Sequence, residues 1–160
     1  MTYKIKKMTM QNGERYCLLV DKNSDMPLSY PNLFVTCFLR NNGASVSTIE
    51  IALSNIIILL RFLKVRKIDL EKRIENNAFL DLSEIEALMR YLRKNFSSLR
   101  NGAEIIPFNR NVAKGTYNYR IHTIKSYMKW ICGLLLKAKG IIERQAVDDF
   151  IKSIEAYKPN

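Results

Sequence analysis

One stretch of the chain, residues 115–138, combines a helical apolar pattern with a run of positive charge. The apolar residues of one face recur at intervals of three or four, and they are Ile121, Ile124, Met128, Ile131, Leu135 and Ala138. That spacing is typical of a helix that packs one face on a core. The same stretch contains Arg120, His122, Lys125, Lys129 and Lys137 and no acidic residue. At about 100° per residue, His122 and Lys129 fall roughly opposite the apolar stripe, so the pattern predicts a helix with one buried and one cationic face.

The positive charge of the chain is concentrated around this helix. The formal net charge is +11, and residues 107–140 contain seven Lys or Arg and no Asp or Glu. A diffuse excess of cations indicates only solubility, whereas a local excess favours a partner with repeating negative charge.

Length and composition favour one folded, mainly helical domain. The chain has 160 residues, of which 48% are hydrophobic, with six Gly and four Pro, unlike a disordered segment. Three separated cysteines and a single His make a zinc site improbable, and Cys17, Cys37 and Cys132 are interpreted as small buried hydrophobic residues in a reducing cytoplasm. No signal peptide is recognised, and the longest apolar run, residues 56–60, is far shorter than the about 20 residues of a membrane span. We expect a cytoplasmic protein without a membrane partner.

The first part of the chain has the pattern of a β-hairpin. Residues 2–21 alternate between apolar and polar positions around Asn12 and Gly13. Asn-Gly between two β-prone runs favours a hairpin because both residues tolerate positive φ. We predict strands at residues 2–10 and 15–21. The lysines of this hairpin are interpreted as a solvated edge, with contact to a phosphate backbone as the alternative.

The middle of the chain predicts two helices after a linker at residues 22–31. A short helix begins at Pro31 and stops near Gly43. Ser47 and Glu50 have the spacing of a capping box, which opens a long helix that is apolar nearly all round. Such a helix is typical of the centre of a bundle.

The last part of the chain alternates short helices with loops. We predict a short helix and turn at residues 69–80, and a packing helix opened by a capping box of Ser83 and Glu86. A long polar loop at residues 96–115 precedes the basic helix, and a final helix begins at Ile141. The predicted organisation is a hairpin and linker at 1–25, a helical domain at 26–140 and a C-terminal helix or linker at 141–160.

Three motifs occur in a familiar order. They are S-V-S-T before a helix ending in L-L-R-F-L, then D-L-S-E-I-E-A-L-M-R-Y-L, then Y-R-I-H-T-I-K-S-Y-M-K-W-I. Residues 31–138 resemble, in order and spacing, the N-terminal core-binding domain of tyrosine recombinases, the phage-integrase family. The resemblance implies a mainly α fold, a SAM-like four-helix bundle with orthogonal helices, here preceded by the hairpin. It implies DNA binding in recombination and integration, with double-stranded DNA and other recombinase protomers as partners.

The chemistry of that family does not carry over to this chain. The family needs an Arg, a Lys, a His-x-x-Arg pair and a nucleophilic Tyr in a separate C-terminal domain, whereas here His122 is followed by Lys125. We expect a non-catalytic DNA-binding fragment with no cofactor, metal or small-molecule substrate, attached in the full protein to a catalytic domain.

The expected DNA contacts come from two helices and the loop between them. They are Ser47, Thr48, Arg61 and Lys64; Arg110 and Lys114; and Tyr117, Tyr119, Arg120, His122, Thr123, Lys125 and Lys129. Phosphate contacts would supply most of the affinity. Arg61 and Lys64, together with Arg66 and Lys67, either stabilise a helix C-terminus or contact phosphate, and the alternative for the tyrosines is core or rim packing. We expect Lys125→Glu with Lys129→Glu to abolish duplex binding.

Two other functions are compatible with the sequence. A free-standing helical module would use the basic face for an acidic protein surface. A single-strand or RNA binder would use Tyr117, Tyr119 and Tyr127 as stacking platforms for bases.

Overall fold

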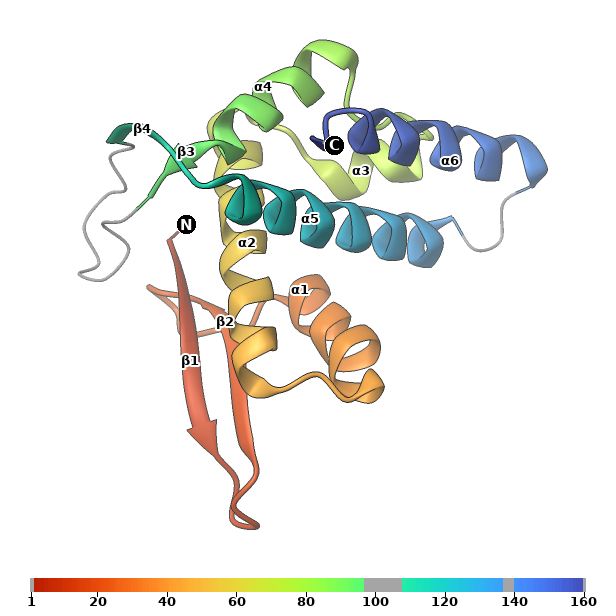
Figure 1. Cartoon of the computed structure of the whole chain (residues 1–160). Helices are drawn as coiled ribbons and strands as arrows, with labels where there is room; N and C mark the ends of the chain where they lie inside the picture. Colours follow the sequence, from red (N-terminus) through yellow and green to blue (C-terminus); the bar gives the residue numbers. More distant parts are fainter. Residues whose placement is uncertain (1, 97–107, 137–139, 160) are drawn as a thin grey trace.

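The computed structural model describes residues 2–96, 108–136 and 140–159 of the chain. Within these residues, an antiparallel β-hairpin is followed by six α-helices, and a short β-pair precedes the fifth (Figure 1). The strands are β1 (Tyr3–Thr9), β2 (Arg15–Asp21), β3 (Lys94–Asn95) and β4 (Phe108–Asn111), and the α-helices are α1 (Ser29–Phe34), α2 (Val46–Val65), α3 (Leu70–Glu75), α4 (Leu82–Leu92), α5 (Lys114–Leu135) and α6 (Ile141–Glu155). A mainly helical chain with an N-terminal hairpin is therefore confirmed, whereas the SAM-like four-helix bundle stays a prediction.

The hairpin forms where the sequence predicts it. β1 and β2 pair antiparallel along their whole length, and the turn closes with the N–H of Gly13 donating to the carbonyl of Met10 at 2.9 Å. Gly13 has a φ of +84°, whereas Asn12 stays outside the left-handed region, so only the glycine of the pair needs positive φ. Cys17 and Leu19 pack into the core, and the tip projects away from the helices (Figure 1).

The segment after the hairpin is a composite helix. Pro31 is the third residue of α1 and not the first, although it remains within the first turn. A π-helical turn (Val35–Leu39) and a 3₁₀ turn (Arg40–Asn42) continue α1. Cys37 in the π-helical turn is exposed, so the prediction that all three cysteines are buried is wrong for this residue. The predicted stop at Gly43 is confirmed, because this residue adopts a left-handed φ of +84°.

Helices α2 and α4 begin at other caps than the sequence predicts. The side chain of Ser45 accepts a hydrogen bond from the N–H of Thr48. Asp81 and Glu84 form the capping box of α4. The predicted boxes, two residues too late in each case, were Ser47 with Glu50 and Ser83 with Glu86. Several residues near the start of each helix have side chains that can act as an N-cap. The residue that caps is the one whose backbone is still extended immediately before the first helical residue.

Helix α5 lies at the centre of the fold. It crosses α2 steeply and also contacts α1, α3, α4 and α6 (Figure 1). Its predicted inner residues Ile121, Ile124, Met128 and Ile131 are fully buried, Leu135 is half-buried, and Ala138 lies outside the described residues. Because five helices surround α5, residues on its other sides are buried as well.

The C-terminal helix α6 packs on α5 and α4. Phe150, Ile151 and Ile154 are buried in the same hydrophobic core as the preceding helices, and the ring of Phe150 stacks on Phe79 with 5.0 Å between centroids. The segment 141–160, predicted as a helix or linker, thus contributes a core-forming helix.

Helix α2 is the most apolar helix of the described chain. By length and composition alone it could cross a membrane, but 56% of its most apolar window is buried inside the protein. This burial is typical of the core helix of a soluble protein, as the sequence predicted for this segment.

The predicted loop at residues 96–115 includes structure that the sequence did not indicate. Residues 97–107 lie outside the described residues, but β4 pairs antiparallel with β3. The N–H of Val112 also donates to the carbonyl of Arg93 at 2.8 Å. The end of α4 and the start of α5 are thereby held together.

Candidate nucleic-acid interface

Three residues that were predicted to contact DNA from α5 are buried. Tyr117, Arg120 and Thr123 are 3%, 8% and 5% exposed. The prediction that they face DNA is wrong for this structure. Neighbouring helices cover a side of α5 that the helical periodicity of the sequence predicted to be exposed to solvent. Tyr119 and His122 of the predicted set are exposed.

Arg120 caps another helix from inside the protein. Its Nη1 donates hydrogen bonds to the carbonyl of Leu92 at 2.7 Å and to that of Lys94 at 2.8 Å. The guanidinium also lies 5.5 Å from the ring centroid of Phe96. The last carbonyls of a helix lack partners within it, so these bonds satisfy the end of α4. Burial lowers the pKa of Arg120, which is ordinarily so high that the side chain stays charged.

Thr123 and Tyr117 hold neighbouring elements against α5. Thr123 Oγ1 donates to the carbonyl of Tyr119 at 3.0 Å and accepts from Nδ2 of Asn55 in α2 at 3.1 Å. The hydroxyl of Tyr117 donates to the carbonyl of Tyr157, just after α6, at 3.3 Å. For Tyr117 this is the packing role that the sequence left as the alternative.

The cationic residues in the middle of α5 are partly neutralised. Lys125 Nζ lies 3.0 Å from Oε1 of Glu155 in α6, and this hydrogen bond holds the pKa of Glu155 below its usual value. Partial burial, together with Lys125 and Lys158, lowers the pKa of His122, so this side chain is mainly neutral at pH 7. Lys129 is exposed. The outer face of α5 therefore presents less positive charge than the sequence predicts.

The predicted contacts from α2 lie at its two opposite ends. Ser47 and Thr48 are in the first turn, whereas Arg61 and Lys64 are near the last turn of this 20-residue helix. At 1.5 Å per residue, the two pairs are roughly 20 Å apart. They do not form one site.

A cationic groove of about 390 Å³ lies where the C-terminal ends of α2 and α4 meet. Its lining residues are Phe62, Val65, Arg66, Ala87, Arg90, Tyr91 and Lys94. Arg93, the residue that follows α4, is also exposed. We use the name cationic groove for the site of Arg66, Arg90 and Lys94. The predicted Arg110 and Lys114 belong to the adjoining β4 and the start of α5, and the side chain of Arg110 lies outside the described residues.

Aromatic rings lie against two of the three cations of the groove. The guanidinium of Arg66 lies 5.1 Å from the ring centroid of Phe62, and Nζ of Lys94 lies 5.7 Å from that of Tyr91. Outside the groove, the guanidinium of Arg93 lies 4.6 Å from the ring centroid of Tyr117 in α5. Such contacts restrain a cation without neutralising it.

The cationic groove is free of ion pairs. None of its three cations pairs with a carboxylate within the described ranges of the chain. The hairpin is different, because Lys4 and Lys6 both approach Asp25 and Lys7 pairs with Glu50. Hairpin lysines are therefore neutralised locally, whereas the groove retains its full charge.

Arg61 lies on the side of α2 between the groove and β1. Its Nη1 is buried and has no hydrogen-bond partner among the residues that the structure describes. Burial lowers its pKa, and Tyr91 and Tyr3 are the nearby titratable groups. A buried donor without a partner is unusual in a folded protein, and an incoming acceptor would satisfy it.

No protein-family model, curated protein or solved structure matches this chain. Its function is therefore inferred from the residues and their geometry.

The sequence analysis did not include Arg90 and Lys94 among the candidate binding residues. The charges of the segment that forms α4 balance, and the segment was therefore assigned to packing. The acidic residues, however, all lie at its start and the basic residues all lie at its end. This segregation along one helix was the signal available in the sequence.

Proposed function

We propose that this chain is the non-catalytic, DNA-binding part of a cytoplasmic site-specific recombinase of the tyrosine recombinase type, and that the cationic groove binds the phosphate backbone of duplex DNA. The observation that carries the proposal is the convergence of three cations from the ends of α2 and α4 on one groove, with no carboxylate paired to them in the described part of the chain.

The side chains of the groove suit phosphate. Two of its three cations are arginines, whose planar guanidinium can donate two parallel hydrogen bonds to one phosphate. All three are exposed, so their donors are accessible to a ligand. Contacts of this kind position a protein on a duplex but do not read its sequence. The groove would therefore supply affinity, and base recognition would come from elsewhere.

The aromatic residues favour a duplex over a single strand. Stacking with unpaired bases needs exposed ring faces. Tyr117 and Tyr127 are 3% and 0% exposed, which leaves Tyr119, at 39%, as the accessible member of the three tyrosines that a single-strand binder would use.

The recombinase assignment rests on the motifs within residues 31–138. In a protein of that type, catalysis would come from a separate domain, and further protomers bound to the same DNA would be partners. The groove itself requires no cofactor, because its proposed ligand is held by hydrogen bonds and charge.

The test is anisotropy of a labelled duplex of about 20 base pairs, with salt varied from about 50 to 200 mM. We expect micromolar binding and a slope of log K against log salt of about −3, for three phosphates neutralised. Arg90→Glu with Lys94→Glu should abolish binding without lowering the melting temperature. Arg144→Glu with Lys152→Glu, on α6, is the control with the same change in net charge.

Two outcomes would contradict the proposal. Equal loss of affinity in both double variants would show that net charge and not the groove attracts DNA. Competition by polyglutamate as effective as that by duplex would favour the protein-interaction module.

A further inference from the structure

Lys67 occupies a backbone position at the end of α2 that favours glycine. Its φ is +56°, in the left-handed region. The N–H of Ile68 donates to the carbonyl of Leu63 at 2.9 Å, and the N–H of Lys67 donates to that of Lys64 at 3.1 Å. These two bonds define a Schellman motif, in which the left-handed residue is most often glycine. A side chain with a Cβ is strained in this conformation.

The chain uses better-suited residues at its other left-handed helix ends. Gly43, with φ of +84°, ends the composite helix after α1. Asn77, with φ of +54°, occupies the same position of a second Schellman motif after α3, where Ala78 donates to the carbonyl of Arg73 at 2.8 Å. Asparagine tolerates this region better than most residues. Lysine has no such preference, so its presence at the end of α2 needs a reason in its side chain.

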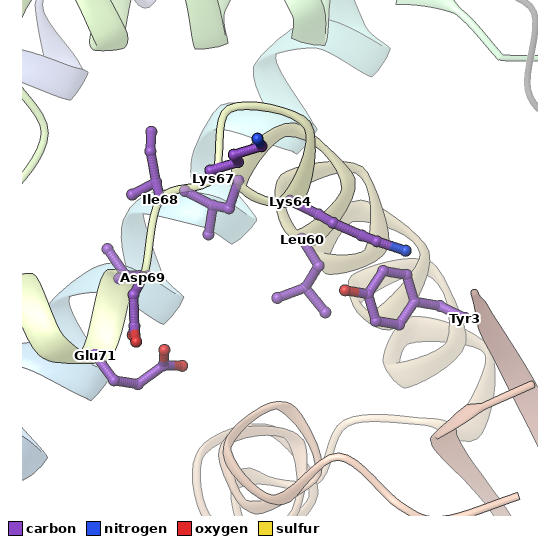
Figure 2. Close-up of a pocket in the computed structure, with 9 residues that line it drawn as sticks. Tyr3, Leu60, Lys64, Lys67, Ile68, Asp69 and Glu71 are labelled. Atoms are coloured by element: carbon purple, nitrogen blue, oxygen red, sulfur yellow. The ribbon is translucent and has the colours of Figure 1, made fainter. Parts of the chain in front are cut away.

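The ammonium of Lys67 is available to a ligand. The residue is exposed and pairs with no carboxylate in the part of the chain that the structure describes. It lines a cavity of about 430 Å³ with Tyr3, Lys64 and Glu71 among its other residues. Figure 2 shows its nitrogen pointing away from the carboxylates of Asp69 and Glu71. The side chain is therefore not held by the nearest acids.

Lys67 extends the positive charge of α2 to a second side of the helix. The cavity is lined from α2 by Leu60, Leu63, Lys64 and Lys67, whereas the cationic groove is lined by Phe62, Val65 and Arg66. At about 100° per residue these two sets face opposite directions. An anion small enough for the groove alone cannot contact Lys67, but a polyanion lying across the end of α2 can contact both sides.

We infer that Lys67 is a phosphate ligand retained at a strained position, so that bound duplex DNA contacts α2 on both sides of its C-terminal end. This inference rests on the proposed function and names a second contact point outside the groove. A glycine substitution at position 67 separates the stability of the helix end from DNA binding. It relieves the backbone strain of the left-handed conformation, but it removes the positive charge.

The experiment compares Lys67→Gly with Asn77→Gly, a matched variant at the same position of the motif after α3. We expect Lys67→Gly to keep or raise the melting temperature, to weaken duplex binding about fivefold at low salt, and to reduce the magnitude of the salt slope by about 0.9, the value for one phosphate. Asn77→Gly should change neither the affinity nor the slope. Lys67→Arg should retain both, because it keeps the charge.

Three results would overturn the inference. If Lys67→Gly binds duplex as the wild type does while Arg90→Glu with Lys94→Glu abolishes binding, the proposal that the cationic groove binds DNA is retained, but Lys67 is not a ligand. If Lys67→Gly lowers the melting temperature by several degrees, the lysine serves the helix end and not DNA. If the wild-type chain does not bind duplex at all, the proposed function and the role of Lys67 both fall.

Discussion

The guanidinium of Arg120 is bound by two backbone carbonyls, those of Leu92 at the end of α4 and Lys94 in β3. Removing it would leave both carbonyls beside a buried space with no donor. A buried polar group without its partner costs about 1–3 kcal/mol, and hydrogen bonds from a charged donor are at the upper end of the range. Arg120 therefore contributes to stability, although its charge suggested a surface role.

We expect Arg120→Met to lower the free energy of unfolding by about 3 kcal/mol, measured by urea denaturation. Arg120→Lys should recover only part of this loss, since one ammonium does not reproduce the geometry of a guanidinium. Lys129→Met, at an exposed position of the same helix, should change stability by less than about 0.5 kcal/mol. Wild-type stability of Arg120→Met would show that the two carbonyls find other donors.

Nothing in the neighbouring sequence distinguishes Arg120 from Lys125. Both lie on one helix and both were placed on its cationic flank by helical periodicity. The helical period of the apolar residues identified the buried stripe of Ile121, Ile124 and Met128, because apolar side chains are stabilised by burial in a core. A buried arginine can be recognised only from the carbonyls that receive it, and these are brought to it by the tertiary fold.

At the scale of elements, the start of α4 joins a cap to an ion pair. Glu84 Oε1 accepts from the N–H of Asp81 at 3.0 Å and also from Nη1 of Arg73 in α3. The hydrogen bond from Arg73 is the main reason that the pKa of Glu84 lies below its ordinary value of 4.5. A carboxylate whose pKa is lowered by folding stabilises the protein above its unfolded pKa, and this contribution is lost as the pH falls through the folded pKa.

We expect Glu84→Gln to lower the free energy of unfolding by about 1 kcal/mol at pH 7, through loss of the cap and the ion pair. Between pH 5 and about pH 3 the wild type should lose stability faster than the variant, so that the difference disappears in acid. Urea denaturation at several pH values measures both effects. A difference in stability between Glu84→Gln and the wild type that stays constant at every pH would exclude the titration of Glu84 as its cause.

The elements with strong local signals could be predicted from the sequence. Asn12-Gly13 marked the hairpin, Gly43 marked a helix end, and long apolar runs marked α2 and α5. The pairing of β3 with β4 could not be predicted, because β3 is two residues long and the sequence around it has the composition of a loop. Strands this short are fixed by the elements on either side, here the end of α4 and the start of α5.

At the scale of the whole molecule, two cationic surfaces are compared as the candidate interface. One is the outer face of α5, where Lys125 pairs with Glu155 and His122 is mainly neutral. The other is the cationic groove, assembled from segments far apart in the sequence. The net charge of residues 107–140 led to the prediction of an interface on α5. In the structure Arg120 is buried and the ends of α2 and α4 meet, and neither feature is visible in the linear sequence. These two features move the candidate interface to α2 and α4.

Neutralising variants distinguish the two surfaces. Arg90→Gln with Lys94→Gln and Lys125→Gln with Lys129→Gln remove the same net charge. We expect the first pair to weaken duplex binding more than about tenfold at low salt and to reduce the magnitude of the salt slope by about 1.8, since two phosphate contacts are lost. The second pair should weaken binding less than about threefold, because one of its lysines is already engaged by Glu155. Both are measured by anisotropy over the same range of salt. The opposite ranking would return the interface to α5, as the sequence alone predicted, and would require α6 to move aside so that Lys125 becomes accessible.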